Sequence, residues 1–383
     1  MRLQDAWVNG HGTQALCAVL GLSGYRALFV GGCVRNALLG GPVTDIDIAT
    51  DAVPETVTEI AESAGFRVIP TGIDHGTVTV IAQGVHHEVT TFRRDVQTDG
   101  RRAVVAYSTD IAEDAARRDF TMNALYAEPS GEVIDPLGGI DDLRARRVRF
   151  VGEPALRIGE DYLRILRFFR FHAVYGDVAQ GIDAEGLAAC AALAEGLDGL
   201  SRERVGAEMR KLLAADNPAP AVAAMARSGV LARVLPGADA GPLALLVHLE
   251  AGLAPRWQRR LALLGGAGDL RLSRAEDSDL GRIRDEIGTT ATPAVLGWTL
   301  GEVPAKDVLL CRAAMFQTPL AGGWLAEVQQ GAGSVFPVTA GDLMPGLSGP
   351  ALGVTLKALQ ARWLASDLTL TRAQLLKIAQ NGA

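Results

Sequence analysis

Two aspartates separated by one residue, Asp45 and Asp47, carry the clearest chemical signal in the sequence. In a strand, residues i and i+2 point to the same face, so both carboxylates are expected to project together. Carboxylates this close repel each other unless a cation lies between them, and Mg²⁺ prefers such oxygens with phosphate oxygens completing its shell. Two such ions activate an attacking hydroxyl and stabilise a leaving pyrophosphate. The pair therefore predicts a Mg²⁺ site for the transfer of a nucleotide.

A glycine turn precedes the two aspartates. The apolar residues 27–30 predict a strand that ends at Gly31 and Gly32. A helix is predicted directly after them, over residues 34–39. Unpaired backbone N–H groups at a helix start, beside a turn without side chains, suit a triphosphate. Arg35 lies near the start of this helix and is placed to reach the same phosphates. A purely structural turn between strand and helix is the alternative interpretation.

Glu88 is the best candidate for a third metal-binding carboxylate. The strand predicted at residues 87–92 carries no other acidic residue. A two-metal site usually takes its third carboxylate from a neighbouring strand, so Glu88 is predicted to join Asp45 and Asp47 in catalysis. A solvent-facing glutamate on an edge strand is the alternative.

The segment at residues 117–125, RRDFTMNAL, interleaves charged and polar residues with apolar ones. This pattern resembles the wall of a pocket more than a solvated face. Arg118 is expected to bind phosphate, while Asp119 or Asn123 is expected to hold ribose hydroxyls. A surface helix with intrahelical salt bridges is the alternative.

The helix predicted at residues 160–173 carries an unusual charged stripe. Asp161, Arg164 and Arg167 recur every three residues, so their side chains are expected within an arc of about 120°. Apolar residues fill most of the remaining surface, and burying unpaired charge is costly. Because arginine donates to base edges and aspartate accepts from them, the stripe predicts base recognition. An ordinary surface ion pair between Asp161 and Arg164 is the alternative.

Composition and charge indicate a folded protein of two or three domains, with 383 residues that are 48% hydrophobic and 21% charged. The formal charge of -7 argues against a general polyanion binder but allows one basic groove. The four cysteines form no CxxC pair, which favours a reducing compartment without a zinc site or disulfides. No apolar run approaches the roughly 20 residues needed to span a bilayer, and MRLQDAWVNG has no apolar signal core. A cytoplasmic protein without a membrane segment is therefore expected.

The pattern of elements predicts an α+β domain to about Gly139, followed by a helical remainder. In the first part, strands are expected at residues 27–30, 44–49, 77–82 and 87–92, and a helix at 54–65. Residues 93–110 are arginine-rich and broken by glycine, which predicts a long mobile loop. In the second part, helices are expected at residues 160–173, 201–214, 219–235 and 355–365, and linkers at 265–269 and 331–333.

These motifs, in this order, resemble the bacterial class II CCA-adding enzymes of the polymerase-beta-type superfamily. The matching stretches are LFVGGCVRNALLG, DID, EVTTFR, RRDFTMNAL, IDPLGGIDDLRARRVR, GEDYLRILRFFRF and SRERVGAEMRKLL. Together they cover about Leu28 to Leu213. The resemblance implies a nucleotidyltransferase head (residues 1–140), a helical neck (141–215) and a helical body and tail (216–383) that hold tRNA. It also implies addition of C, C and A to the tRNA 3′ end from CTP and ATP, without a nucleic-acid template.

The resemblance also implies roles for individual residues. Gly32 and Arg35 would touch the phosphates of the nucleotide, Asp45 and Asp47 would bind Mg²⁺, and Arg118 would contact the incoming nucleotide. Asp161 and Arg164 would pair with the Watson–Crick edge of the base, and Arg167 and Arg170 would complete the nucleotide site. The segment at residues 93–110 would be the loop associated with switching from CTP to ATP.

One departure and several alternatives stand beside this resemblance. Many relatives have aspartate where this chain has Asn36, which leaves the role of that carboxylate open. Enzymes that add only CC or only A, and a poly(A) polymerase, belong to the same family. A non-catalytic RNA-binding protein on the same fold is disfavoured because Asp45 and Asp47 are both present. An enzyme that transfers nucleotides to small molecules or proteins would not need Asp161 and Arg164.

Overall fold

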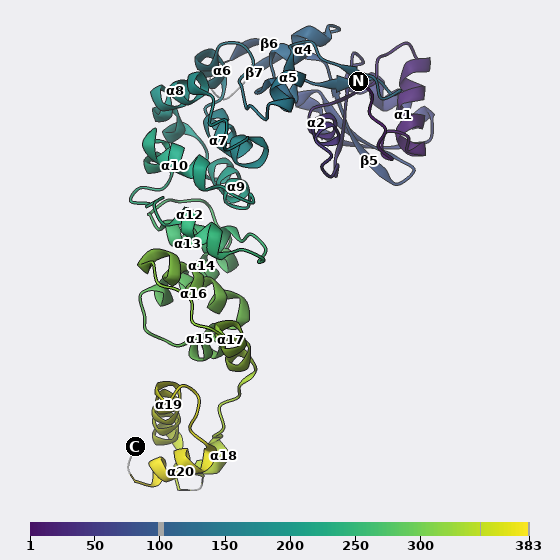
Figure 1. The fold of residues 1–383 in the computed structure, drawn as a ribbon. Helices are drawn as coiled ribbons and strands as arrows, with labels where there is room; N and C mark the ends of the chain where they lie inside the picture. The colour runs from purple at the N-terminus through teal and green to yellow at the C-terminus, as the bar shows by residue number, and fades with distance from the viewer. Residues whose placement is uncertain (99–102, 345, 382–383) are drawn as a thin grey trace. The chain divides into compact units, whose positions relative to one another are not determined.

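The computed structural model describes residues 1–98, 103–344 and 346–381, and Figure 1 shows their fold. The chain forms two compact units. Unit 1 comprises Met1–Leu212 and Pro220–Val234, and unit 2 comprises Leu213–Ala219 and Leu235–Ala383. All the strands that the structure describes lie between Leu28 and Ile134, and the described elements after them are helices. The predicted α+β class with a helical remainder is therefore confirmed.

A seven-stranded sheet forms the centre of the first part of unit 1. Its order is β3 (Arg67–Gly72), β4 (Thr77–Ala82), β5 (Val85–Thr91), β2 (Ile46–Thr50), β1 (Leu28–Val30), β8 (Tyr126–Ala127) and β9 (Val133–Ile134). Only β2 and β5 pair in parallel among the described strands, and all the other pairs in this sheet are antiparallel. The apolar strand β1 is buried along its whole length, which places its C-terminal glycines at the edge of the core.

Three helices that border this sheet follow from local sequence signals. Helix α3 (Pro54–Ser63) begins with the predicted proline, because proline fits the first helical position. Together with α1 (His11–Leu22), α3 packs against β4 and β5. Helix α2 (Gly32–Leu38) starts directly after β1 and packs against β1 and β2. The strand–glycine–helix connection predicted at Gly31 and Gly32 is confirmed.

The segment at residues 93–110 differs from the sequence prediction. The structure places β6 (Arg93–Thr98) and β7 (Ala103–Tyr107) in a separate antiparallel pair, followed by α4 (Ile111–Ala116). Residues 99–102 of the predicted loop lie outside the described residues. The run AVVAY favours a strand, and its polar, arginine-rich neighbours hid this signal. The loop prediction is therefore wrong for the described part of the segment.

The helix predicted at residues 160–173 is interrupted. Helix α6 (Pro154–Glu160) ends before Asp161, and α7 (Leu163–Tyr175) begins two residues after it. Asp161 has an extended backbone, with φ −155° and ψ 105°. Its Oδ1 accepts a hydrogen bond of 3.1 Å from the backbone N–H of Leu163, an N–H group that the new helix leaves unpaired. The prediction of one continuous helix with Asp161 on its charged stripe is therefore wrong.

Further helices complete unit 1, namely α5 (Gly139–Arg144), α8 (Ala184–Ala192), α9 (Arg202–Leu213), α10 (Ala219–Arg227) and α11 (Val230–Val234). Helix α9 confirms the prediction at residues 201–214. The helix predicted at 219–235 is divided into α10 and α11, because Gly229 between them has a φ of +77° that a continuing helix does not allow.

The described elements of unit 2 that follow Leu235 are helices: α12 (Leu243–Leu249), α13 (Trp257–Leu264), α14 (Arg274–Ile287), α15 (Pro293–Leu300), α16 (Glu302–Phe316), α17 (Trp324–Gly333), α18 (Ala340–Leu343), α19 (Gly349–Ala365) and α20 (Arg372–Gln380). Residues 265–269 lie between α13 and α14, whereas residues 331–333 lie inside α17, so the second linker prediction is wrong. Gly331 serves close packing there, because a Cβ atom would lie 1.9 Å from the backbone oxygen of Ala294 in α15.

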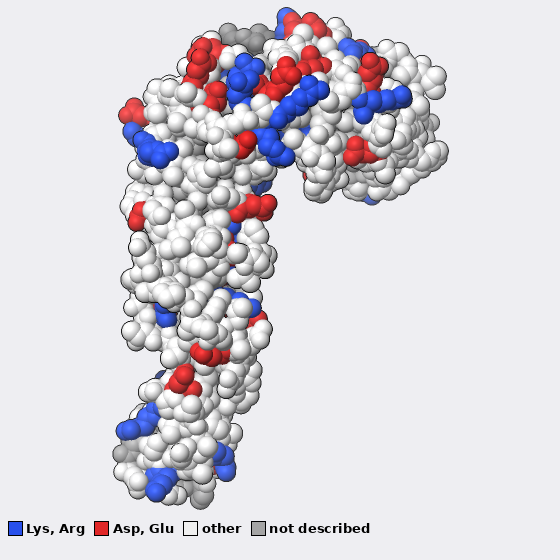
Figure 2. All heavy atoms as spheres, viewed as in Figure 1, with Lys and Arg blue, Asp and Glu red and all other residues white. Residues whose placement is uncertain are grey.

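Charged side chains of both signs lie intermingled over the visible face of unit 1, whereas the visible face of unit 2 carries fewer of them (Figure 2). This mixed pattern agrees with the modest formal charge of -7. Within the described residues, no helix is both long enough and apolar enough to cross a membrane.

Candidate active site

Three carboxylates lie on or beside the neighbouring strands β2 and β5. Asp47 in β2 lies directly opposite Glu88 in the parallel β5, and Asp45 immediately precedes β2. Burial raises the pKa of half-buried Asp47 to about 6, and the charges of Glu88 and Asp45 add to this effect. Among the described residues, no group of three histidine, cysteine, aspartate or glutamate side chains is placed to hold a metal ion by itself. The cluster nevertheless fits a cation that also takes oxygens from a bound phosphate.

The glycine turn brings arginines from two segments to these carboxylates. Gly31 has a φ of +69°, which favours glycine. A Cβ atom at Gly31 would lie 3.4 Å from Nη1 of Arg118. A Cβ atom at Gly32 would lie 3.8 Å from Nη2 of Arg35 and 4.0 Å from Oδ2 of Asp47. The turn therefore leaves space at a point where two cations and a carboxylate converge.

Arg35 is a buried cation whose hydrogen-bond partners among the described residues are neutral. Its guanidinium donates to Oδ1 of Asn123, to Oδ1 of Asn36 at 2.9 Å and to the hydroxyl of Tyr175 at 2.7 Å. It also stacks on the Tyr175 ring, 4.1 Å from the ring centre. Burial lowers the pKa of Arg35, and no carboxylate in the described chain forms an ion pair with it. A buried charge without a counter-ion suits an anionic ligand.

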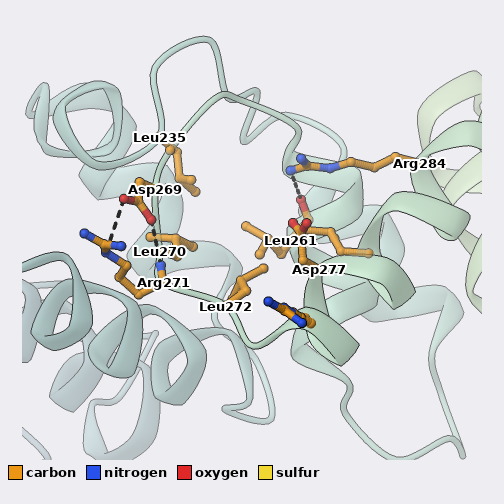
Figure 3. Close-up of a pocket in the computed structure, with 11 residues that line it drawn as sticks. Leu235, Leu261, Asp269, Leu270, Arg271, Leu272, Asp277 and Arg284 are labelled. Atoms are coloured by element: carbon orange, nitrogen blue, oxygen red, sulfur yellow. Dashed lines mark hydrogen bonds and ion pairs between the residues drawn. The ribbon is translucent and has the colours of Figure 1, made fainter.

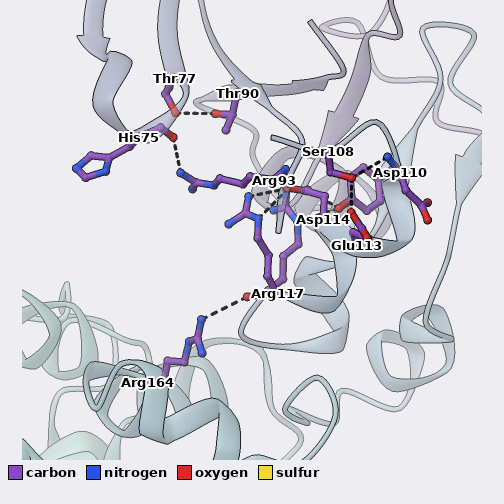
Figure 4. Close-up of polar contacts among 12 residues, drawn as sticks. His75, Thr77, Thr90, Arg93, Ser108, Asp110, Glu113, Asp114, Arg117 and Arg164 are labelled. Carbon is purple, nitrogen blue, oxygen red and sulfur yellow. Dashed lines mark hydrogen bonds and ion pairs between the residues drawn. The ribbon is translucent and has the colours of Figure 1, made fainter. Parts of the chain in front are cut away.

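Arg118 is held by Asp114, a residue that the sequence reasoning missed. Asp114 is 1% exposed and accepts bonds from Arg118 at 2.9 Å, Arg117 at 2.7 Å and the Tyr126 hydroxyl at 2.7 Å. Figure 4 shows how Asp114 and the neighbouring Arg93 come together. Burial alone would raise the pKa of Asp114, but the two arginines hold it at about 2. The spacing of Asp114 from Arg117 and Arg118 (i+3 and i+4) was the available sequence signal.

Asp119 and Asn123 connect the two sides of the site. Asp119 accepts a bond of 2.8 Å from Nδ2 of Asn123 and two bonds, the first of 2.8 Å, from Arg167 in α7. The charge of Arg167 outweighs the effect of burial, so the pKa of Asp119 lies below its usual range. Because Asn123 in turn accepts from Arg35, one chain of bonds runs from α2 to α7.

Arg167 and Arg170 surround Phe171 and share Glu208. Nε of Arg170 donates to Glu208 at 2.6 Å, while Arg167 lies 3.7 Å from the same carboxylate. The guanidinium carbons of Arg35, Arg167 and Arg170 lie 4.7 to 5.3 Å from the Phe171 ring centre. Sequence reasoning missed both Glu208 and Phe171. Glu208 lies in α9, 38 residues from Arg170 in α7, so the sequence gives no local signal of their contact.

Asp161 and Arg164 do not pair with each other, so neither the predicted stripe nor its ion-pair alternative is found. Arg164 donates to Glu160 and to the backbone oxygens of Arg157 at 2.6 Å and Arg117 at 3.3 Å, the last shown in Figure 4. Asp161 Oδ2 instead accepts a bond of 2.6 Å from Nη2 of Arg204 in α9. The sequence did not predict this pair, because 43 residues separate Arg204 from Asp161.

A separate pocket of about 410 Å³ lies in unit 2 between α13 and α14 (Figure 3). Two of its three arginines already have partners: Arg271 lies 3.4 Å from Asp269, and Arg284 donates to the backbone oxygens of Leu261 and Gly265. This pocket lacks the strand-edge carboxylates and the open glycine turn of unit 1. The candidate active site is therefore the one in unit 1.

Comparison with known proteins gives consistent results. The family model "Poly A polymerase head domain" matches residues 27–149, and "Probable RNA and SrmB- binding site of polymerase A" matches residues 181–241. The mitochondrial CCA tRNA nucleotidyltransferase 1 of Mus musculus is 34% identical over 95% of this chain and 89% of its own. The CCA-adding enzyme of Geobacillus thermodenitrificans is 40% identical over 77% and 76% of the two chains. The crystal structure of the Bacillus stearothermophilus CCA-adding enzyme with CTP superposes with a TM-score of 0.75, at 31% identity over 97% of both chains.

Proposed function

We propose that this chain, which belongs to the family of CCA-adding enzymes, adds C, C and A to the 3′ end of tRNA from CTP and ATP. The reaction forms one phosphodiester bond at a time and releases pyrophosphate, without a nucleic-acid template. The observation that carries the proposal is the convergence of Asp47, Arg35 and Arg118 at one open glycine turn. A family membership that extends over both units supports the same conclusion.

Asp45 and Asp47 are proposed to hold Mg²⁺, with Glu88 as the third catalytic carboxylate. Members of this family are nucleotidyltransferases, and the choice of Mg²⁺ rests on the oxygen-only donor set of these side chains. When bound, the metal supplies charge that activates the 3′ hydroxyl of tRNA and neutralises the departing pyrophosphate. Burial, together with the charges of Glu88 and Asp45, raises the pKa of Asp47, which supports a cation at this point.

The remaining site residues are proposed to bind the nucleotide. Gly31 and Gly32 leave room for the triphosphate beside Arg35 and Arg118, and a buried cation with neutral partners gains most from an anion. The other proposed nucleotide-binding residues lie in or near helix α7 and the RRDFTMN segment: Asp119, Asn123, Asp161, Arg164, Arg167 and Arg170.

Base recognition is assigned to Asp161 and Arg164. Cytosine and adenine both present an amino group, from which an aspartate accepts a hydrogen bond. Both also present ring acceptors, to which an arginine donates a hydrogen bond. Residues 1–140 are proposed as the catalytic head and 141–215 as the neck. Residues 216–383 are proposed as body and tail, which hold the tRNA so that its acceptor end reaches the head.

The test is incubation with tRNA that lacks its 3′ CCA, with CTP and ATP supplied separately and together in the presence of Mg²⁺. We expect two C residues with CTP alone and a complete CCA with both nucleotides. Arrest after CC with both nucleotides would identify an enzyme that adds only CC, and a long A tail would identify a poly(A) polymerase. A folded protein that incorporates nothing under any condition would refute the catalytic proposal.

A further inference from the structure

Asp161, the proposed base-reading carboxylate, has a side-chain partner that lies far from it in sequence. Nη2 of Arg204 in α9 donates to Asp161 Oδ2 at 2.6 Å, and the backbone N–H of Leu163 donates to Oδ1 at 3.1 Å. Both side chains remain partly accessible, with Arg204 45% and Asp161 30% exposed. The carboxylate is therefore fixed from two directions and is still open to solvent.

This fixation matters because the backbone at Asp161 provides little orientation of its own. Asp161 lies between α6 and α7 with an extended backbone, so no helix turn restricts its side chain. Arg164, the other proposed base reader, is held separately by Glu160 and by backbone oxygens. Among the described side chains, Arg204 is the one that pairs with Asp161.

We propose that Arg204 is a positioning residue for the choice of base, acting through Asp161. A carboxylate that is paired with a guanidinium only accepts hydrogen bonds. Oriented in this way, Asp161 accepts from the amino groups of cytosine and adenine and repels the carbonyl oxygens that uracil and guanine present at the same position. A carboxylate that is free to rotate discriminates less. This inference rests on the proposed function, because it assumes that Asp161 meets the base.

The exposure of the pair makes the proposal testable without unfolding the protein. Exposed ion pairs contribute about 0.2–1 kcal/mol, so loss of Arg204 should leave the fold intact while it alters the orientation of Asp161. An energy of this size corresponds to a change of up to about fivefold in a rate ratio.

The experiment compares Arg204→Gln with Arg204→Lys and with the control Arg202→Gln, an arginine of the same helix. For each protein, kcat/KM is measured with CTP, UTP, ATP and GTP on tRNA that lacks CCA or ends in CC. We expect Arg204→Gln to raise the UTP:CTP and GTP:ATP ratios by up to about fivefold, with Tm unchanged. Arg204→Lys should give a smaller rise, and Arg202→Gln none.

A double variant separates the possible outcomes. In an Asp161→Ala background, Arg204→Gln should change the ratios no further, because its partner is absent. A uniform fall in kcat/KM for all four nucleotides, or unchanged ratios, would overturn the inference while CCA addition by the wild-type chain stands. If the wild-type chain incorporates neither C nor A, the proposed function itself fails and the inference fails with it.

Discussion

The two sides of the active site differ in how their charges are balanced. The strand side is the region where α2 meets β2 and β5, and the helix side is α7 with the residues that pair with its arginines. On the strand side, Arg35 has neutral partners and Asp47 is flanked by two further carboxylates. On the helix side, each arginine forms an ion pair with a carboxylate of another segment: Arg167 with Asp119, and Arg170 with Glu208. A charged side chain without a counter-ion favours the binding of a charged ligand. A side chain in an ion pair is held in one orientation by its partner. This difference supports the proposal that the strand side holds metal and phosphate and that the helix side holds the base.

The largest expected effect concerns the carboxylates of the strand side. We expect Asp47→Ala to lower kcat/KM for CTP by about 10³-fold, because metal-assisted charge stabilisation is lost. Binding of tRNA, measured by filter binding, should remain nearly unchanged. The control Glu59→Ala, on the exposed side of α3, should retain full activity. Equal loss of tRNA binding and activity would instead indicate a structural role for Asp47.

On the helix side, removal of one partner of an ion pair should lower the stability of the fold. Arg167→Gln leaves Asp119 buried without its charged partner, so we expect the free energy of unfolding to fall by about 3 kcal/mol. Urea denaturation followed by circular dichroism measures this change. The double variant Arg167→Gln with Asp119→Asn should recover part of the loss. A stable single variant would show that the helix side does not depend on balanced charge.

Arg35 provides the contrasting case on the strand side. Arg35→Gln removes a buried cation that has no counter-ion, so we expect unfolding stability to stay the same or rise. The KM for CTP and for ATP should rise equally, by about 10²-fold, because the phosphates are common to both nucleotides. A change in the preference between CTP and ATP would place Arg35 at the base instead. Steady-state kinetics with each nucleotide distinguishes the two results.

The sequence predicted the strand side far better than the helix side, and the physical reason is local geometry. Gly31, Gly32 and Asp47 lie within about twenty residues of one another on β1, α2 and β2, which were predicted, whereas β3, β8 and β9 of the same sheet were not. Glu88 required only the pairing of β2 with β5. Local patterns such as DID and GG encode such contacts directly.

The helix side depends on contacts between distant segments. The partner of Asp161 is Arg204, and the partner of Arg170 is Glu208, in each case from another helix. Apolar periodicity also continued through residues 160–173 and hid the break at Asp161, because one extended residue does not alter the pattern of its neighbours. Side-chain partners across helices are set by tertiary packing, which a single sequence does not display.

Asp114 gives the smallest expected effect. It lies on the strand side, but its charge is paired with Arg117 and Arg118. Its folded pKa of about 2 lies below the usual 3.8. Its ionisation therefore stabilises the fold fully above pH 4 and progressively less as the pH falls toward 2, a contribution of about 2 kcal/mol. We expect Asp114→Asn to be less stable than the wild type by about this amount at pH 7, with the difference shrinking below pH 4. Urea titrations between pH 7 and pH 3 measure it. A difference that stays constant with pH would show that packing around Arg118, rather than charge, holds this part of the site.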